Sequence, residues 1–240
     1  MPVPGQPGQV RWLPKSRCDC EVAEWEQHQA ELQLAATAVG TAGATAGRTT
    51  GGVGLRFAES RLGNFDQRAG TEVALAEATA FVQDFAARSE RGEGLLFIGG
   101  FGTGKTRLAA AVLNEVQERY GGTVRSEVVP ELLQRLRQTY DAGSRGTEDQ
   151  VLQPLLRTSL LLLDDIGAER VTEWVQERLF LVIDHRYRNR QPTLFTTNLH
   201  PEDLEDRLGG RIVSRIVGMA TLVRLSTDDY RLREHPSQDA

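Results

Sequence analysis

A glycine-rich loop placed between an apolar run and a helical pattern constrains this 240-residue chain more than any other feature. Residues 99–106 read G-G-F-G-T-G-K-T, which fits G-x-x-x-x-G-K-[ST] at every fixed position. The loop follows the apolar run 95–98 and opens a helical pattern over 106–120. In such a loop, consecutive backbone N–H groups curl around phosphate oxygens, and the positive end of the helix dipole adds to the attraction. The chain is therefore predicted to bind a nucleotide through its phosphates.

The residue types in this loop suggest a role for each position. Lys105 is expected to bridge the β- and γ-phosphates of ATP, and the Thr106 hydroxyl is expected to ligate Mg²⁺. A glycine-rich turn that binds nothing is the alternative, but the strand before the loop and the helix after it favour the phosphate site. The predicted nucleotide-binding residues are Gly99, Gly100, Phe101, Gly102, Thr103, Gly104, Lys105, Thr106 and Arg107.

Strand and helix patterns alternate from residue 55 onward. Continuous apolar runs are typical of strands buried on both faces of a parallel sheet, and the helices between them are typical of crossover connections. The predicted strands are 95–98, 124–129, 160–163, 193–197 and 221–225. The predicted helices are 71–87, 106–120, 131–140, 173–188 and most of 201–217, with a polar loop over 141–149. The predicted fold class is α/β, a three-layer P-loop NTPase built on a parallel sheet.

Two carboxylates follow the apolar strand 160–163. Parallel sheets bind ligands at the carboxyl ends of their strands, which is also where the phosphate loop lies. Asp164 is the candidate for holding Mg²⁺ together with Thr106, and Asp165 is the candidate for polarising the attacking water. Because Asp is one methylene shorter than Glu, we expect slow hydrolysis, with ATP acting more as a switch than as fuel. An Asp-Asp pair that merely forms a turn is the alternative.

Two further features are candidates for the same chemistry. Asn198 ends the strand 193–197 and could lie near the γ-phosphate and the water, although a strand-to-loop turn capped by Asn is an equally ordinary explanation. Arg207, Arg211 and Arg215 are spaced four apart and therefore share one helical face. A solvated face is the default interpretation of such a run. The functional one is an arginine finger that neutralises transition-state charge in a neighbouring subunit's site.

Composition changes divide the chain into three parts. Residues 1–34 are predicted to be a separate N-terminal segment that contains Cys18 and Cys20, residues 35–54 an Ala/Gly/Thr-rich linker, and residues 55–240 the ATPase domain. Cys18, Cys20 and His28 are one ligand short of a closed zinc site, so the sequence does not decide whether this segment binds zinc. The chain has no apolar run long enough to span a membrane and no signal peptide, and we expect a cytoplasmic protein without membrane contact.

The set of motifs resembles the AAA+ ATPases, and within them the bacterial DnaC/DnaI-type replicative helicase loaders. Beyond the phosphate loop, the resemblance rests on Leu62-Gly63-Asn64-Phe65, Asp164-Asp165-Ile166-Gly167-Ala168-Glu169, Thr196-Thr197-Asn198, Arg211-Ile212-Val213-Ser214-Arg215 and Asp229-Tyr230-Arg231. It implies that Asn198 is the sensor amide and that Arg215 or Arg211 is the finger, with Arg215 preferred. It also implies an AAA+ core without a full C-terminal lid. Arg231, near the C-terminal end of the sequence, would be a further sensor-like residue.

The resemblance further implies partners and a function. In that family the N-terminal segment docks on the hexameric replicative DNA helicase, and the ATPase part binds single-stranded DNA and self-associates through a shared ATP site. The expected function is ATP-dependent loading of the helicase onto single-stranded DNA during DNA replication. The net charge of −5 provides no global basic field, so nucleic acid would need a local patch. Arg135, Arg137 and Tyr140 could form one, or could equally be a solvated helix face.

Three rival functions remain open. An IstB-type transposition helper ATPase has very similar core motifs. In a non-catalytic adaptor, the bound nucleotide would stabilise the fold and the protein would tether its partners. Asp165 in place of Glu is compatible with this alternative. A small-molecule kinase is disfavoured because finger arginines would have no partner in a monomer.

Overall fold

The computed structural model describes residues 54–140 and 147–227. Its centre is a five-stranded, fully parallel sheet with the order β2-β3-β4-β1-β5. The strands are β1 (Gly94–Ile98), β2 (Val124–Val128), β3 (Leu160–Asp164), β4 (Thr193–Thr197) and β5 (Ala220–Arg224). Their bounds agree with the sequence-based expectations to within one residue at each end. The order places β4 between β1 and β3, which the sequence alone does not reveal.

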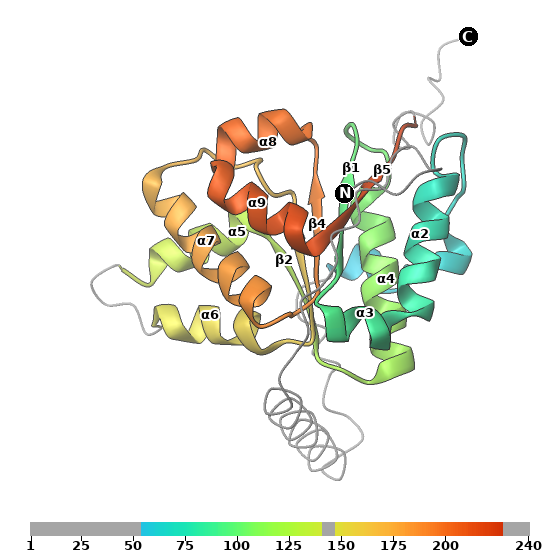
Figure 1. Cartoon of the computed structure of the whole chain (residues 1–240), viewed down its shortest axis with the longest axis horizontal. Helices are drawn as coiled ribbons and strands as arrows, with labels where there is room; N and C mark the ends of the chain where they lie inside the picture. Colours follow the sequence, from blue (N-terminus) through green and yellow to red (C-terminus); the bar gives the residue numbers. More distant parts are fainter. Residues whose placement is uncertain (1–53, 141–146, 228–240) are drawn as a thin grey trace, which may run out of the picture. The chain divides into compact units, whose positions relative to one another are not determined.

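Helices cover both faces of the sheet, and Figure 1 shows the two helical layers on either side of it. One face is covered by α2 (Glu72–Gln83), α3 (Phe85–Arg91) and α4 (Lys105–Tyr120). The other is covered by α5 (Val129–Gln138), α6 (Glu148–Arg157), α7 (Glu173–Arg188), α8 (Pro201–Leu208) and α9 (Gly210–Met219). The predicted three-layer α/β class is therefore confirmed.

The apolar strands feed two separate cores. Along β1, Leu95 and Phe97 pack under the α2–α4 layer, whereas Leu96 and Ile98 pack under the α5–α9 layer. This alternation follows from the two-residue period of side chains along a strand. Because both faces are covered, every position of β1, β3 and β4 is buried. That burial is why β1 and the first four residues of β3 appear in the sequence as apolar runs, whereas the equally buried β4 carries three threonines.

Three helix predictions need correction. The segment predicted as one helix over 71–87 is two helices, because Asp84 leaves helical geometry at φ −102° and ψ 17°. Helix α6 occupies residues for which the sequence patterns predict no helix, although its start at Thr147 carries a capping box with Gln150. Pro154 lies inside α6 and weakens the helical signal there.

The third correction concerns the arginine run. Gly209 adopts φ +86° between α8 and α9, so 201–217 is not one helix. Arg207 therefore belongs to α8, whereas Arg211 and Arg215 belong to α9. The expected common face of all three arginines is wrong, because the glycine breaks the helical period between them.

The N-terminal docking segment 1–34, the linker up to residue 53 and Arg231 lie outside the described residues. Their predicted boundaries and roles, and the zinc question at Cys18, Cys20 and His28, therefore stay predictions. In the described ranges, no helix is both long and apolar enough to cross a membrane.

Candidate nucleotide site at the carboxyl ends of the central strands

The phosphate loop connects β1 to α4 and owes its shape to glycines. Gly102 and Gly104 have φ values of +66° and +88°, which side chains disfavour. A Cβ atom on Gly99 would lie 2.3 Å from the carbonyl oxygen of Leu225, so only glycine fits beside the chain that leaves β5. Helix α4 begins at Lys105, as the motif predicts to within one residue, and its N-terminus faces the loop. The result is a set of backbone N–H groups suited to an anion.

Lys105 is buried, with an exposed fraction of 5%, and its ammonium group contacts neutral oxygens. Nζ donates to the carbonyl oxygens of Gly99 and Gly100 at 3.0 and 2.6 Å. It also donates to Oδ1 of Asn198 at 2.7 Å. These acceptors hold the positive charge at the mouth of the loop, where the motif requires it for phosphate.

Asn198 lies between the loop and the carboxylates because β4 lies between β1 and β3. While Oδ1 accepts from Lys105, Nδ2 donates to Oδ1 of Asp165 at 3.2 Å. The structure thus brings together three residues that the sequence nominated separately. Their catalytic roles stay predictions, but their placement agrees with the expected sensor position.

Asp164 and Thr106 form a pair of hard oxygen donors beside the loop. The Thr106 hydroxyl donates to Oδ1 of Asp164 at 2.9 Å, and Thr196 donates to the same oxygen at 2.6 Å. Burial raises the pKa of the Asp164 carboxyl, and the hydrogen bond from Thr196 partly opposes that rise. A carboxylate and a hydroxyl in direct contact suit Mg²⁺, which binds oxygen ligands and keeps several waters. The residues present therefore fit the predicted magnesium site.

Thr196 is a residue of this site that the sequence reasoning did not single out. It is fully buried, and besides donating to Asp164 it accepts the backbone N–H of Asp165 at 2.9 Å. Asp165 has φ +57°, a conformation uncommon for a residue other than glycine. Thr196 therefore stabilises the turn that presents the Asp165 carboxylate. Its signal in the sequence was only a hydroxyl within a buried strand.

The site opens into a cavity of about 570 Å³. The sequence predicts only some of the residues that line it. Its lining residues are Arg56, Phe57, Glu59, Ser60, Asn64, Phe65, Phe101, Gly102, Gly104, Lys105, Thr106, Arg107, Asp165 and Asn198. One wall is the lead-in segment (residues 55–65), which contains the 3₁₀ helices Leu55–Phe57 and Leu62–Asn64. A cavity of this size, polar at the loop end, suits a nucleotide-sized ligand.

Polar side chains of α4 hold the lead-in segment in place. Nδ2 of Asn114 lies within 3.0 Å of the carbonyl oxygens of Phe57 and Ser60. Glu115 accepts the backbone N–H of Leu62 at 2.8 Å. Arg107, predicted to bind nucleotide, lines the cavity and donates to the carbonyl oxygen of Asn64 at 2.8 Å. The same helix that begins at the phosphate loop thus also positions the opposite wall.

The arginines predicted as finger candidates lie elsewhere. Neither Arg211 nor Arg215 lines the cavity at the phosphate loop within the described part of the chain. Both contact α7 instead: Arg215 pairs with Asp184 at 2.9 Å, and the Arg211 guanidinium lies 4.4 Å from the centre of the Phe180 ring. Arg207 donates to the carbonyl oxygen of Gly167 at 2.8 Å and so braces the loop that follows β3.

The residues that the sequence suggests for nucleic-acid binding, Arg135, Arg137 and Tyr140, differ in their contacts. Arg135 pairs with Glu127, and Tyr140 is hydrogen-bonded to Glu148, which fits the solvated-face alternative for these two. Arg137 instead lies over the Trp174 ring at 5.1 Å and lines a second cavity of about 720 Å³.

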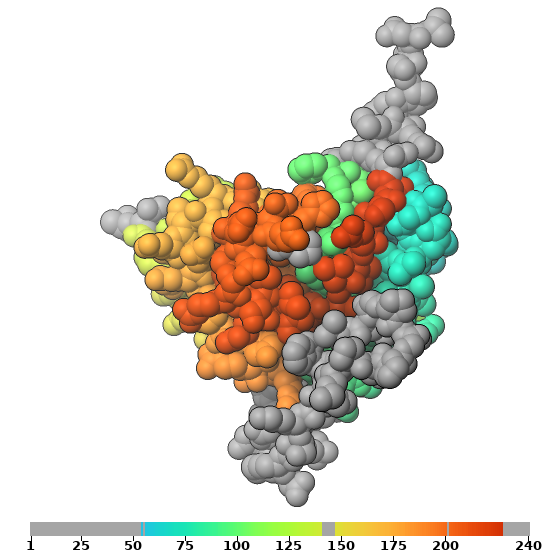
Figure 2. All heavy atoms as spheres, turned by 45° about the horizontal axis from the view of Figure 1, so that its top comes forward, coloured from blue at the N-terminus to red at the C-terminus, as the bar shows by residue number. Residues whose placement is uncertain are grey.

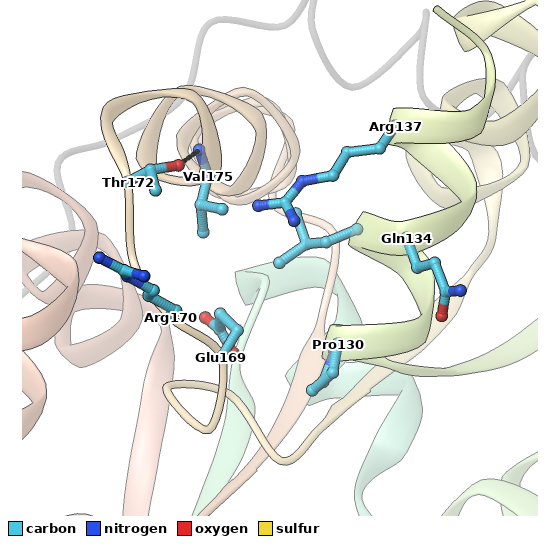
Figure 3. Close-up of a pocket in the computed structure, with 8 residues that line it drawn as sticks. Pro130, Gln134, Arg137, Glu169, Arg170, Thr172 and Val175 are labelled. Atoms are coloured by element: carbon cyan, nitrogen blue, oxygen red, sulfur yellow. Dashed lines mark hydrogen bonds between the residues drawn. The ribbon is translucent and has the colours of Figure 1, made fainter. Parts of the chain in front are cut away.

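Figure 3 shows this second cavity, with Arg137, Gln134 and Pro130 projecting from α5 and Glu169 and Arg170 lying on the segment before α7. Both Glu169 carboxylate oxygens are buried and lack a well-formed hydrogen bond within the described ranges. Burial raises the pKa of this carboxyl, and backbone N–H groups nearby offset only part of the rise. Two arginines and a carboxyl therefore face one hollow.

Comparisons with known proteins agree with this geometry. A family model described as "IstB-like ATP binding protein" matches residues 60–238. Replicative helicase loader DnaC of Escherichia coli (strain K12) is 28% identical over 217 residues, covering 89% of this chain and 86% of that protein. Replicative helicase loader DnaI of Bacillus subtilis (strain 168) is 33% identical over 164 residues, covering 61% of this chain and 49% of DnaI, about half of that relative. The crystal structure of the DnaC helicase loader matches with a TM-score of 0.64 at 31% identity, covering 71% of this chain and 99% of that one.

Proposed function

The chain belongs to the family of IstB-like ATP-binding proteins, and from this premise we propose that it is an AAA+ ATPase that loads a replicative DNA helicase onto single-stranded DNA. The observation that carries the proposal is the bridge of Asn198 between Lys105 and Asp165. It joins the phosphate-binding ammonium to the candidate base through a single amide. The similarity to DnaC along most of both chains supports helicase loading as the use of that ATPase site.

The proposed chemistry assigns each side chain a task. The N–H groups of the phosphate loop and Lys105 bind the β- and γ-phosphates, so Lys105 exchanges its carbonyl contacts for phosphate oxygens. Asp165 orients and polarises the attacking water, and Asn198 holds Asp165 and the γ-phosphate in register. Thr106 and Asp164 would hold Mg²⁺, which supplies positive charge that neutralises the phosphates when it is bound.

Slow hydrolysis is part of the proposal. Asp165 is one methylene shorter than Glu and therefore reaches less far toward the γ-phosphate. Its carboxylate is also held by the Asn198 amide, at 3.2 Å. A long-lived ATP state suits a switch, in which bound nucleotide defines the conformation that engages partners and hydrolysis ends it.

Self-association through a shared ATP site is proposed from the position of α9. Neither Arg211 nor Arg215 lines the cavity of its own chain, and Arg211 is exposed while Arg215 is partly exposed. Figure 2 shows α8 and α9 at the surface in orange to red. An arginine in this position can act on a nucleotide only in a second copy. For single-stranded DNA, the cavity flanked by Arg137 and Arg170 is our candidate contact, since arginines bind both phosphates and base faces.

The second candidate function is that of an IstB-type transposition helper, favoured by the description of the matching family model. The two candidates differ in partner rather than in ATP chemistry. A non-catalytic adaptor stays as the third and differs in needing no hydrolysis.

The deciding experiment measures ATP hydrolysis and helicase loading together. A purified hexameric replicative helicase and circular single-stranded DNA are mixed with wild type, Lys105→Ala, Arg215→Ala or the control Glu77→Gln. Glu77 on α2 pairs with Arg88 on α3, on the face of the sheet away from α9, and neither residue lines the nucleotide cavity. We expect wild-type ATPase activity per molecule to rise with protein concentration and with DNA. We expect both Lys105→Ala and Arg215→Ala to lose that rise.

The outcomes separate the candidates. Loading of helicase onto the closed DNA circle by wild type and Glu77→Gln, but not by Lys105→Ala, supports the loader. Loading that survives Lys105→Ala supports the adaptor. ATPase activity without any helicase loading, but with stimulation by a transposase, supports the transposition helper.

A further inference from the structure

Helices α7 and α9 pack side by side (Figure 1). Side chains on their facing sides form matching rows. Phe180, Asp184 and Tyr187 are spaced by four and three residues, so they share one face of α7. Arg211 and Arg215 are four apart on α9 and meet that row. The register is regular, with Arg211 over the Phe180 ring at 4.4 Å and Arg215 over the Tyr187 ring at 5.0 Å.

Asp184 lies between the two rings and is the charged centre of this contact. Its exposed fraction is 7%, and one carboxylate oxygen accepts from Nε of Arg215 at 2.9 Å. The other oxygen pairs with Nε of Arg188 at 2.8 Å. The hydrogen bond from Arg215 lowers the pKa of Asp184, so the carboxylate stays ionised at neutral pH.

The backbone of α9 comes close enough to α7 to hold this arrangement. A Cβ atom on Gly218 would lie 3.0 Å from the Tyr187 ring, closer than such contacts usually are. The ring that stacks on Arg215 is thus itself confined by α9. Asp184, Tyr187 and Gly218 together restrict where the Arg215 guanidinium can go.

This arrangement leaves the two Nη atoms of Arg215 available for another contact. The contact with Asp184 uses Nε, and within the described ranges neither Nη atom makes a hydrogen bond. The side chain is 35% exposed. The Nη edge of a guanidinium offers two parallel donors, the geometry that matches a phosphate.

Arg211 is held differently. It stacks on Phe180 but has no carboxylate partner in the part of the chain that the structure describes. A guanidinium that rests on a ring alone is less fixed in direction than one that is also hydrogen-bonded through Nε. Of the two finger candidates, the arrangement therefore favours Arg215.

We propose that Asp184 is a positioning residue for the ATPase reaction: it anchors Arg215 through Nε, so that the Nη edge is ready to contact the nucleotide bound by a second copy of the chain. The inference rests on the proposed shared ATP site and extends it to a residue with no contact to nucleotide. Orienting the guanidinium before the two copies meet reduces the ordering that the transition state would otherwise require.

The test is a mixing experiment with Asp184→Asn. Alone, at concentrations that saturate self-association, this variant should lose roughly 10- to 100-fold in kcat while KM for ATP stays near wild type. The nucleotide cavity and its lining residues are untouched, so binding of ATP should be preserved. Glu77→Gln, which breaks the partly buried pair with Arg88, is the matched control and should keep the wild-type kcat.

Mixing Asp184→Asn with Lys105→Ala then distinguishes positioning in a second copy from damage to the variant's own site. Lys105→Ala has a disabled phosphate loop but an intact Arg215–Asp184 pair. In a mixed assembly, the intact nucleotide site of an Asp184→Asn copy can receive Arg215 from a Lys105→Ala copy, and that site should hydrolyse ATP. The ATPase activity of the mixture should therefore exceed the sum of the separate activities several-fold. Asp184→Glu, which keeps the charge, should retain more kcat than Asp184→Asn.

Three outcomes overturn the inference. These are wild-type kcat for Asp184→Asn alone, a mixture no more active than the sum of its parts, or an equal loss in Asp184→Asn and Glu77→Gln. The failure of the underlying proposal looks different. If the ATPase activity of Arg215→Ala matches that of wild type at every protein concentration, there is no shared site, and the positioning role of Asp184 is excluded as well. If Arg215→Ala is defective but Asp184→Asn is not, only the positioning role fails.

Discussion

The ammonium nitrogen of Lys105 lies 2.7 Å from Oδ1 of Asn198, although the two residues are 93 positions apart in the chain. The phosphate loop and the end of β4 therefore meet at this contact. The other end of the same amide contacts Asp165. In the proposed reaction, a γ-phosphate would replace Oδ1 at Lys105, and Asn198 would then contact the phosphate while keeping its contact with the Asp165 carboxylate.

Replacing Asn198 should separate hydrolysis from binding. In Asn198→Ala we expect hydrolysis to fall about 10²-fold, as it does when one preorganised polar contact to the reacting group is lost. ATP affinity should change by no more than about fivefold, because a single hydrogen bond has a net worth of about 1 kcal/mol. Single-turnover hydrolysis and equilibrium nucleotide binding measure the two effects. Asn189→Ala, at the exposed end of α7, is the control, and equal losses in both measurements would contradict the sensor role.

Thr196→Val should destabilise the turn at the base position. The substitution keeps the shape but leaves the Asp164 carboxylate without one donor and the Asp165 N–H without its acceptor. Buried groups that lose partners cost about 1–3 kcal/mol each, so the free energy of unfolding should fall by at least about 1 kcal/mol. Hydrolysis should fall with it. Denaturant unfolding is the measurement, with Thr79→Val on α2 as the control, since the Thr79 hydroxyl donates only within its own helix.

Asn114→Ala should weaken binding of the nucleoside more than binding of the phosphates. This asparagine holds the lead-in segment that forms the wall opposite the loop, whereas the loop itself depends on its glycines. We expect ATP affinity to fall about tenfold, the effect of roughly 1.4 kcal/mol. The affinity for inorganic tripolyphosphate should be unchanged. Calorimetric titration of both ligands decides, and a parallel loss of the two would point to damage of the loop. Gln117→Ala, one turn further along α4, is the control.

Arg186 should be among the most sensitive positions for stability. Its side chain is fully buried and donates to the carbonyl oxygens of Leu155, Thr158 and Pro192 and to the hydroxyl of Thr193. It links α7 to the ends of α6 and β4 in this way, and burial lowers its pKa to about 9. Arg186→Met removes the donors from three buried carbonyls and should cost at least about 3 kcal/mol of unfolding free energy. Exposed Arg157→Met should cost less than about 0.5 kcal/mol in the same denaturant series.

The Asp184–Arg215 pair should show itself in the pH dependence of stability. Because Arg215 lowers the pKa of Asp184, the folded state binds the proton more weakly than the unfolded state does. The pair's contribution is therefore complete above the ordinary carboxyl pKa of about 4 and is lost as the pH falls through the lower folded value. Wild type should exceed Asp184→Asn in unfolding free energy by about 1 kcal/mol at pH 7, and the difference should shrink below about pH 4. A constant difference across that range would exclude a stabilising pair.

The sequence by itself determined the strands, most of the helices and the phosphate loop. Apolar runs, glycines and helical periods are properties of a few neighbouring residues, so five strands and the phosphate loop could be predicted to within a residue. Asp164 and Asp165 could be nominated for the same reason, because a residue that follows a parallel strand lies at the ligand-binding edge. Local preference was insufficient where one residue interrupts a pattern, as at Asp84 and Gly209.

Only the tertiary structure decided which residues meet. The order of the strands puts β4 between β1 and β3, and this alone makes Asn198 a bridge and Thr196 a support for the two carboxylates. Likewise, the packing of α9 on α7 gives Arg215 a carboxylate partner that Arg211 lacks within the described ranges. These contacts join residues 31 to 93 positions apart. Their geometry depends on how whole elements pack, and no window of neighbouring residues contains that information.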